Sequence, residues 1–203
     1  LPSAEGMVFF ALTPVQVFQF TNIFWFYHDD GERRLVRDVL LFVPRKFSKT
    51  TSIATLSVYD LLYGDANAES YVGSNSYQQS QVCFGVISKI LRALDPQLRR
   101  FKINREQVFN RMPGKMSIAR CLSSAADRLD GLNASLVIID EYAQAESDAL
   151  KIVLTSSMVA RRNPLTFVIT TASDKLDTPF TEMLDAYKSI LRGEVENDSI
   201  FAH

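Results

Sequence analysis

The feature that most constrains the fold is a strand, a loop and a helix that follow one another directly around residue 50. The apolar run 39–42 predicts a strand, residues 43–50 form a short loop, and residues 51–63 predict a helix. Lys49 and Thr50 stand where the loop meets the helix. The free N–H groups and the dipole of a helix N-terminus favour anions, so a phosphate suits this junction.

The loop matches part of the P-loop pattern G-x-x-x-x-G-K-[ST]. Lys49 and Thr50 occupy the phosphate-binding and magnesium-binding positions, whereas Val43 and Ser48 replace the two glycines. Glycine lets the backbone approach a phosphate closely and adopt positive φ. Taken alone, the segment is explained about as well by a Lys-Thr pair at the start of an ordinary helix.

A second element is the run 136–141, in which four apolar residues are followed at once by Asp140 and Glu141. A strand that is apolar at every position is typical of a parallel sheet buried on both faces, and ligands bind at the carboxyl ends of such strands. Neighbouring carboxylates there need a positive charge, which magnesium on nucleotide phosphates supplies. We expect Asp140 to hold Mg²⁺ or its water and Glu141 to polarise the attacking water. The alternative is an exposed acidic pair that opens the next loop.

A third apolar run, 165–169, ends in Thr170, Thr171, Ala172 and Ser173. Small hydroxylated residues at the end of a strand can hydrogen-bond a γ-phosphate, a water or the acidic strand, and can therefore sense hydrolysis. Thr and Ser are also common turn residues, so this motif gains meaning only beside the other two.

The order of elements predicts an α/β fold of the P-loop NTPase type: a mostly parallel sheet with helices on both faces and a small antiparallel insertion. Residues 1–203 are expected to form one domain. The carboxyl ends of the strands then share one edge, which brings Lys49, Asp140 and Thr170 within reach of one nucleotide. Further helices are expected at 15–27, where apolar positions would pack on the sheet, and at 77–94, 147–159 and 179–191; a strand is expected at 70–73, and short antiparallel strands at 101–103, 107–109 and 116–118.

Charge and composition exclude several classes of protein. The net charge of -1 excludes a globally basic nucleic-acid coat, and no apolar run reaches the roughly 18 residues of a membrane span. A soluble, cytosolic protein with free cysteines is expected. Basic residues gather in three groups that are either solvated faces, contacts for DNA phosphates or, in the last group, an arginine finger: Arg99, Arg100, Lys102 and Arg105; Arg111, Lys115 and Arg120; and Arg161 with Arg162.

In combination, the motifs resemble the ATPase domain of the large terminase subunit of tailed double-stranded-DNA phages. The resemblance covers about residues 13–173 and rests on Arg-Lys-x-x-Lys-Thr, Leu-Asp-Gly-Leu-Asn at 129–133, Leu-Val-Ile-Ile-Asp-Glu and Ile-Thr-Thr-Ala-Ser. It implies ATP and Mg²⁺ as cofactors, with Glu141 and a charge-stabilising Arg45 as catalytic residues. It implies metal contacts from Thr50 and Asp140, and nucleotide contacts from Gln16 (against the adenine), Arg45, Lys46, Ser48, Lys49, Thr50, Thr51, Thr170 and Thr171.

The resemblance also implies partners and a location. A terminase ATPase would act as a homo-oligomeric ring on the procapsid, in the cytoplasm of the bacterial host. Its partners there would be double-stranded DNA, a portal protein and a small terminase subunit. The nuclease domain of such proteins is not expected here, because the 30 residues 174–203 are too few for a separate core.

Two alternative functions remain open from the sequence. A helicase-like translocase shares the acidic pair, but would normally add a second domain of the same type. A nucleotide-binding assembly module without hydrolysis is favoured by Ser48 and by the missing first glycine. The set of Lys49, Asp140 and Glu141 opposes this second alternative.

Overall fold

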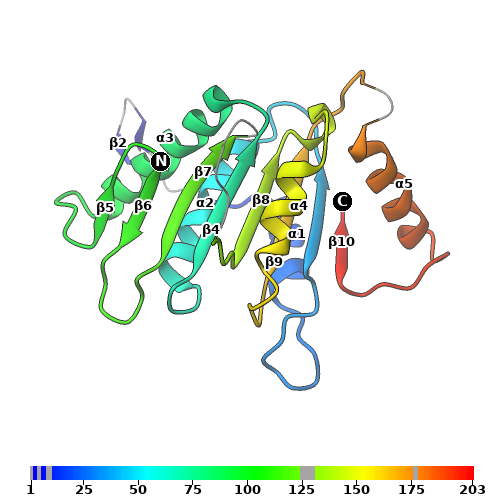
Figure 1. Cartoon of the computed structure of the whole chain (residues 1–203), viewed down its shortest axis with the longest axis horizontal. Coiled ribbons are helices and arrows are strands. Elements are labelled where there is room, and N and C mark those ends of the chain that lie inside the picture. The colour runs from blue at the N-terminus through cyan, green and yellow to red at the C-terminus, as the bar shows by residue number, and fades with distance from the viewer. Residues whose placement is uncertain (1, 4–5, 8–10, 124–130, 176–177) are drawn as a thin grey trace.

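The computed structural model describes residues 2–3, 6–7, 11–123, 131–175 and 178–203, and its centre is an eight-stranded sheet (Figure 1). The strand order is β10-β3-β9-β8-β4-β7-β6-β5. The strands are β3 (Asp38–Phe42), β4 (Glu69–Ser74), β5 (Phe101–Ile103), β6 (Gln107–Asn110), β7 (Ile118–Ser123), β8 (Leu136–Asp140), β9 (Leu165–Thr170) and β10 (Ile200–Ala202). Separately, β1 (Pro2–Ser3) and β2 (Gly6–Met7) pair antiparallel in a two-stranded sheet.

Helices cover both faces of the sheet. The helices are α1 (Pro14–Phe24), α2 (Lys49–Tyr63), α3 (Tyr77–Leu94), α4 (Ala149–Ser156), α5 (Pro179–Leu191) and the 3₁₀ helix η1 (Tyr142–Gln144). One core lies between the sheet and α1, α2 and α3, and a second core lies between the sheet and η1, α4 and α5. Every residue of β8 and β9 is buried, as expected for strands with both faces covered.

The strands from β10 to β7 run parallel to one another, and β6 and β5 add an antiparallel end to the sheet. The predicted fold class, a mostly parallel α/β sheet with a small antiparallel insertion, is therefore confirmed. Among the described residues, no helix is long and apolar enough to cross a bilayer.

The third insertion strand is placed differently from the prediction. It covers Ile118–Ser123 rather than 116–118, and it belongs to the main sheet because it pairs parallel with β4 as well as antiparallel with β6. A strand with one parallel and one antiparallel neighbour carries no local pattern that reveals both pairings. The strand β10 was not predicted either; it pairs with β3 and ends beside His203, whose Nδ1 accepts a 2.9 Å hydrogen bond from the amide nitrogen of Gln19.

The helix α1 is confirmed, but it buries a different face from the one predicted. Its buried side chains are Gln16, Gln19 and Ile23, whereas Val17 and Phe18 are exposed. The two amides can be buried because they are hydrogen-bonded: Gln16 closes a capping box with Thr13, and Gln19 bonds His203.

Candidate nucleotide-binding site

The loop between β3 and α2 lacks the expected glycines but has a left-handed backbone at two positions. Lys46 (φ 69°) and Ser48 (φ 58°) both adopt the left-handed conformation. This conformation costs an L-residue about 1–2 kcal/mol and costs glycine almost nothing. Position 48 therefore has the geometry for which glycine is the usual choice, and Ser48 adopts it with an exposed side chain that makes no cap to α2.

Lys49, the first residue of α2, lies between the two predicted acids. Its Nζ is 3.1 Å from Oδ1 of Asp140 and also forms an ion pair with Glu141. The side chains of Lys49, Asp140 and Glu141 are only 12%, 9% and 19% exposed. The parallel sheet brings these residues together because β3 and β8 flank β9 and all three end at the same edge.

Burial raises the pKa of the Asp140 carboxyl above its ordinary value, Lys49 opposes that shift, and the neighbouring charge of Glu141 adds to it. The upward direction means that one lysine does not fully compensate two adjoining carboxylates in this partly dry position. The acidic pair is therefore suited to a further cation.

The backbone of Glu141 is held in an unusual conformation by its neighbours. Its φ of 55° and ψ of 40° are left-handed. Its carbonyl accepts a 2.8 Å hydrogen bond from Nδ2 of Asn75 and a 2.9 Å bond from the N–H of Gln144. Its own N–H donates to the carbonyl of Ile169 at 3.0 Å. These bonds fix where the Glu141 side chain leaves the sheet edge, and nothing in the sequence analysis assigned Asn75 to the site.

Both threonines at the end of β9 contact the acidic loop. The hydroxyl of Thr170 is fully buried and accepts a 3.0 Å hydrogen bond from the N–H of Ala143 in η1. The hydroxyl of Thr171 donates to Oε2 of Glu141 at 3.3 Å. Thr170 therefore ties β9 to η1 from inside, while Thr171 reaches the carboxylate itself.

An open cleft of about 510 Å³ lies over these residues. Most of the predicted site residues line it, and two that were not predicted, Pro44 and Gln144, join them; the lining is Pro44, Arg45, Lys46, Ser48, Lys49, Thr50, Thr51, Glu141, Gln144 and Thr171. Arg45 and Lys46 are exposed and make no ion pair within the described part of the chain. The cleft is thus lined by two exposed cations without an ion pair in the described chain and by one acid, Glu141. Asp140 and Thr170, also predicted for the site, do not line it.

Gln16, which was predicted to face the adenine, does not line this cleft. Its amide oxygen accepts from the N–H of Thr13, and its amide nitrogen donates to the hydroxyl of Ser52 at 3.3 Å. Gln16 therefore joins the first turn of α1 to the first turn of α2. Its role against a base stays a prediction.

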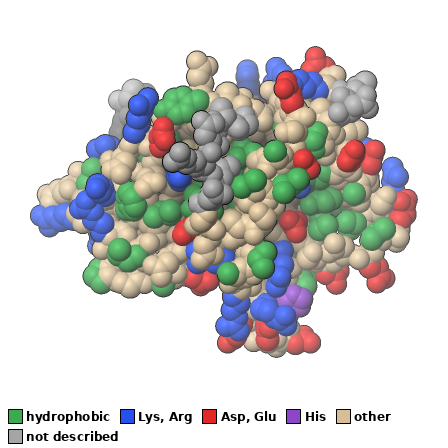
Figure 2. Space-filling view, in the orientation of Figure 1, with side chains coloured by type: hydrophobic (Ala, Val, Ile, Leu, Met, Phe, Trp, Pro, Cys, Tyr) green, Lys and Arg blue, Asp and Glu red, His purple; other side chains and the backbone are tan. Residues whose placement is uncertain are grey.

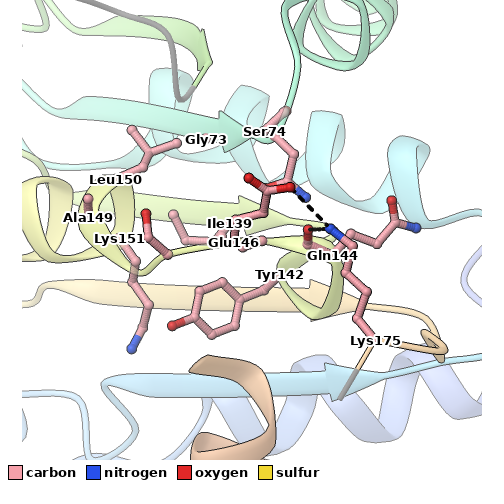
Figure 3. A pocket seen from close by; sticks show the side chains of 13 residues that line it. Gly73, Ser74, Ile139, Tyr142, Gln144, Glu146, Ala149, Leu150, Lys151 and Lys175 are labelled. Atoms are coloured by element: carbon pink, nitrogen blue, oxygen red, sulfur yellow. Dashed lines mark hydrogen bonds and ion pairs between the residues drawn. The ribbon is translucent and has the colours of Figure 1, made fainter. Parts of the chain in front are cut away.

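A second hollow of about 440 Å³ adjoins the cleft and shares Gln144 with it (Figure 3). It lies where β4 and β8 end, and Lys175 is one of its lining residues. Nζ of Lys175 donates to the carbonyl of Gln144 at 3.1 Å and pairs with Glu146 at 3.6 Å. Gln144 therefore forms part of the wall between the two hollows.

The third basic group lies away from the cleft. Arg161 donates to the carbonyls of Asn67 at 2.7 Å and Asn133 at 3.0 Å, just before β4 and β8 begin, and Arg162 pairs with Glu32. These contacts lie at the sheet edge opposite the cleft, and they explain Arg161 without an arginine finger. In the predicted 129–133 motif, residues 129 and 130 lie outside the described residues.

A lysine at the start of the helix after a core strand, facing an Asp-Glu pair at the same edge of a mostly parallel sheet, defines a P-loop-type nucleotide-binding domain. The model of one family, described as the ATPase domain of the terminase large subunit, matches residues 14–190. This chain belongs to that family. The resemblance predicted from the sequence is confirmed, and the helicase-like alternative is not favoured.

Solved structures agree with the fold. The large terminase of bacteriophage HK97 is similar over 96% of this chain and 39% of its own length, with a TM-score of 0.78 and 22% identity. The large terminase of a thermophilic bacteriophage, solved in complex with ADP, is similar over 91% of this chain and 44% of its own length, with a TM-score of 0.62 and 14% identity.

A shorter similarity links the chain to the protein YmfN of Escherichia coli strain K12, with 35% identity over 72 residues. These residues are 36% of this chain and 16% of YmfN. The chain thus spans less than half the length of each of these three relatives.

The raised pKa of Asp140 makes a prediction about stability. The folded protein holds this proton more tightly than the unfolded chain does, so the contribution to stability is greatest below the unfolded pKa and is lost as the pH rises through the folded pKa. Asp140→Asn cannot ionise, so the variant does not lose this stability as the pH rises. Without nucleotide, the variant should be at least as stable as the wild type at about pH 7, with a smaller difference near about pH 4.5 in urea titrations. If the variant were clearly less stable at neutral pH, the ion pair between Lys49 and Asp140 would stabilise the fold by more than burial of the Asp140 carboxylate destabilises it.

The hydrogen bond from Asn75 makes a prediction about turnover. Asn75→Ala removes a donor worth about 1 kcal/mol from the carbonyl of Glu141, so kcat for ATP should fall roughly five- to tenfold. The KM should change little, because Asn75 does not line the cleft. Steady-state kinetics separate the two constants. A rise in KM at constant kcat would contradict a role in positioning Glu141.

Proposed function

We propose that this chain is the ATP-hydrolysing motor domain of a phage or prophage large terminase and powers the movement of double-stranded DNA into a procapsid. The observation that carries the proposal is the placement of Lys49, which lines the cleft, between Glu141, which also lines it, and the buried Asp140. Membership of the terminase ATPase family supports it. Residues 1–203 are proposed to act as one ATPase unit.

The residues present fit a magnesium-bound nucleotide. Asp140 and Glu141 are two largely buried carboxylates whose one cation partner in the described chain is Lys49, and burial disfavours the charge on Asp140. Carboxylate and hydroxyl oxygens are the ligands that Mg²⁺ prefers, and Asp140 and Thr50 would provide them. When bound, Mg²⁺ supplies positive charge to the phosphate oxygens and to the acids.

In the proposed scheme, Lys49 can pair either with the carboxylates of Asp140 and Glu141 or with nucleotide phosphates. In the nucleotide-free chain it compensates Asp140 and Glu141. If these acids were neutralised by Mg²⁺, Nζ of Lys49 would be free to turn toward phosphates bound at the N-terminus of α2. The N–H groups of the loop and the exposed cations Arg45 and Lys46 would face the same phosphates.

Glu141 is proposed to orient and polarise the attacking water, and Arg45 to stabilise negative charge that develops on the transferred group. The hydroxyl of Thr171 already touches the Glu141 carboxylate, and Thr170 holds η1. A shift of Glu141 during hydrolysis would therefore be felt at the end of β9, which is the proposed route of coupling.

An assembly module that binds nucleotide without hydrolysing it is the second candidate, because Ser48 replaces glycine. The geometry weakens this argument against hydrolysis, because Ser48 adopts the left-handed conformation that glycine would adopt and its side chain is exposed. The proposed partners are a portal protein, a small terminase subunit and further copies of this chain in a ring, in the cytoplasm of the bacterial host.

Lys49→Ala tests the phosphate-binding assignment. The change removes a cation whose charged hydrogen bonds contribute about 1.5–3 kcal/mol, so the Kd for Mg·ATP should rise roughly tenfold or more in calorimetry. Lys46→Ala is the matched control, because Lys46 lies in the same loop but is exposed and unpaired in the described chain; it should change the Kd less. Equal Kd values for the wild type and Lys49→Ala would refute the P-loop assignment.

Glu141→Gln tests the catalytic assignment. The amide keeps an acceptor for Thr171 and nearly the same shape but loses the charge that polarises water, so kcat should fall by about two orders of magnitude while Mg·ATP still binds. Single-turnover hydrolysis and nucleotide binding are measured on the same sample. Turnover at the wild-type rate would remove Glu141 from the mechanism and shift attention to Glu146 and Asp148.

A further inference from the structure

The antiparallel end of the sheet carries a concentration of positive charge that the nucleotide site does not explain. Residues 99–120 contain seven Lys or Arg and one acid, whereas the whole chain has 22 and 23. Figure 2 shows Lys and Arg side chains gathered at the β5 and β6 end of the molecule. Within the described residues, none of these seven cations forms an ion pair.

Strand alternation sorts these cations onto one face. Phe101, Val108, Ala119 and Cys121 point into the core beneath α2 and α3. Successive side chains of a strand point to opposite faces, so Lys102 on β5 and Arg120 on β7 lie on the other face. Arg100 and Arg111 continue the same alternation just beyond β5 and β6. We name this set the basic sheet face: Arg100, Lys102, Arg111 and Arg120.

The basic sheet face remains accessible. The helices described on this side, α4 and α5, pack against β4, β8, β10 and η1. Arg100, Lys102 and Arg111 are exposed and Arg120 is half-buried. Neighbouring strands lie about 4.8 Å apart, so the three strands spread these cations over a surface about 10 Å wide.

The arrangement is unfavourable for the protein by itself. The N–H of Arg111 donates to the carbonyl of Arg100 at 2.7 Å, which places the two arginines directly opposite each other. Like charges in that relation destabilise a sheet. Protection of an open edge from aggregation would explain Lys102 on the edge strand β5, but not Arg120 on β7, which has a strand on each side.

The nearby acids relieve this repulsion only in part. The carboxylate of Asp95 accepts the backbone N–H of Arg100 at 2.7 Å and is attracted by its charge, and Glu106 accepts the hydroxyl of Tyr77 at 3.3 Å. In the described part of the chain, neither acid lies within ion-pair distance of an arginine or lysine. Without an ion pair in the described chain, these cations remain able to bind an external anion.

We propose that the basic sheet face binds the phosphate backbone of double-stranded DNA. The choice of DNA rests on the proposed function as a DNA-moving motor, and the location rests on the geometry above. Cations that contact phosphates position a duplex without reading its sequence, which is what a motor that moves along any sequence requires. The cleft and this face lie on different parts of the sheet, so DNA and nucleotide would bind together.

The test is duplex binding by the 203-residue chain, measured by fluorescence anisotropy at several salt concentrations. The variant Lys102→Glu/Arg111→Glu should raise the Kd about tenfold or more and lower the salt slope by about 1.8, or about 0.9 for each lost phosphate contact. Arg111→Glu faces Arg100 with an opposite charge, so the variant should keep the wild-type Tm. A duplex Kd equal to that of the wild type would overturn the proposal.

Lys89→Glu/Arg92→Glu is the matched control, because it reverses two exposed charges on α3, on the other side of the sheet. It should leave the duplex Kd within about twofold of the wild type. An equal loss of duplex affinity in both variants would indicate a general charge effect and overturn the proposal. If poly-glutamate displaced the labelled duplex as strongly as unlabelled DNA does, the proposal would also be overturned, because that result would point to an acidic protein partner. Basal ATP turnover is measured in parallel: its absence from the wild type refutes the proposed function, while the comparison of DNA affinities still decides this inference.

Discussion

The ion pairs of Lys49 with Asp140 and Glu141 are the interaction on which the rest of the site depends. These groups can meet only if three strands end at the same sheet edge and the helix α2 begins there. The parallel order β3-β9-β8 provides that edge. Two adjoining carboxylates in a partly buried position would lower the stability of the fold if no cation faced them. Removing the cation alone would leave both charges uncompensated. In the nucleotide-free protein, the lysine that the proposed mechanism uses therefore also compensates these acids.

Backbone strain is concentrated around the same groups. Six non-glycine residues have positive φ in the described part of the chain, and three of them, Lys46, Ser48 and Glu141, line the cleft. Each costs on the order of 1–2 kcal/mol, which the surrounding hydrogen bonds must offset. At Glu141 the bonds from Asn75 and Gln144 and to Ile169 do this. Strain at a cleft that lies beside the buried, charge-disfavoured carboxyl of Asp140 indicates a site shaped for binding rather than for stability.

Much of this could be predicted because it depends on local pattern. The runs 136–139 and 165–169 indicate buried parallel strands, and the rule that such strands end at one edge predicts Lys49, Asp140 and Thr170 together. Lys49 and Asp140 do meet, whereas Thr170 is buried against Ala143 and its neighbour Thr171 contacts Glu141. The same rule applied to the polar residues after β4 would have pointed to Asn75, whose bond to Glu141 was missed. Other features depend on distant partners and leave no local signal. These are the mixed pairing of β7, the strand β10, and the buried amides of Gln16 and Gln19, which pack inward because Ser52 and His203 bind them.

Phosphate release from ATP by the 203-residue chain, with and without Mg²⁺ and with and without duplex DNA, tests the central claim most directly. Because Lys49, Asp140 and Glu141 are already assembled, the account predicts slow phosphate release that requires Mg²⁺. It also predicts that release rises when DNA is present. Nucleotide binding with no phosphate release under any of these conditions would contradict it, and the chain would then be a binding module that has kept the site without the reaction.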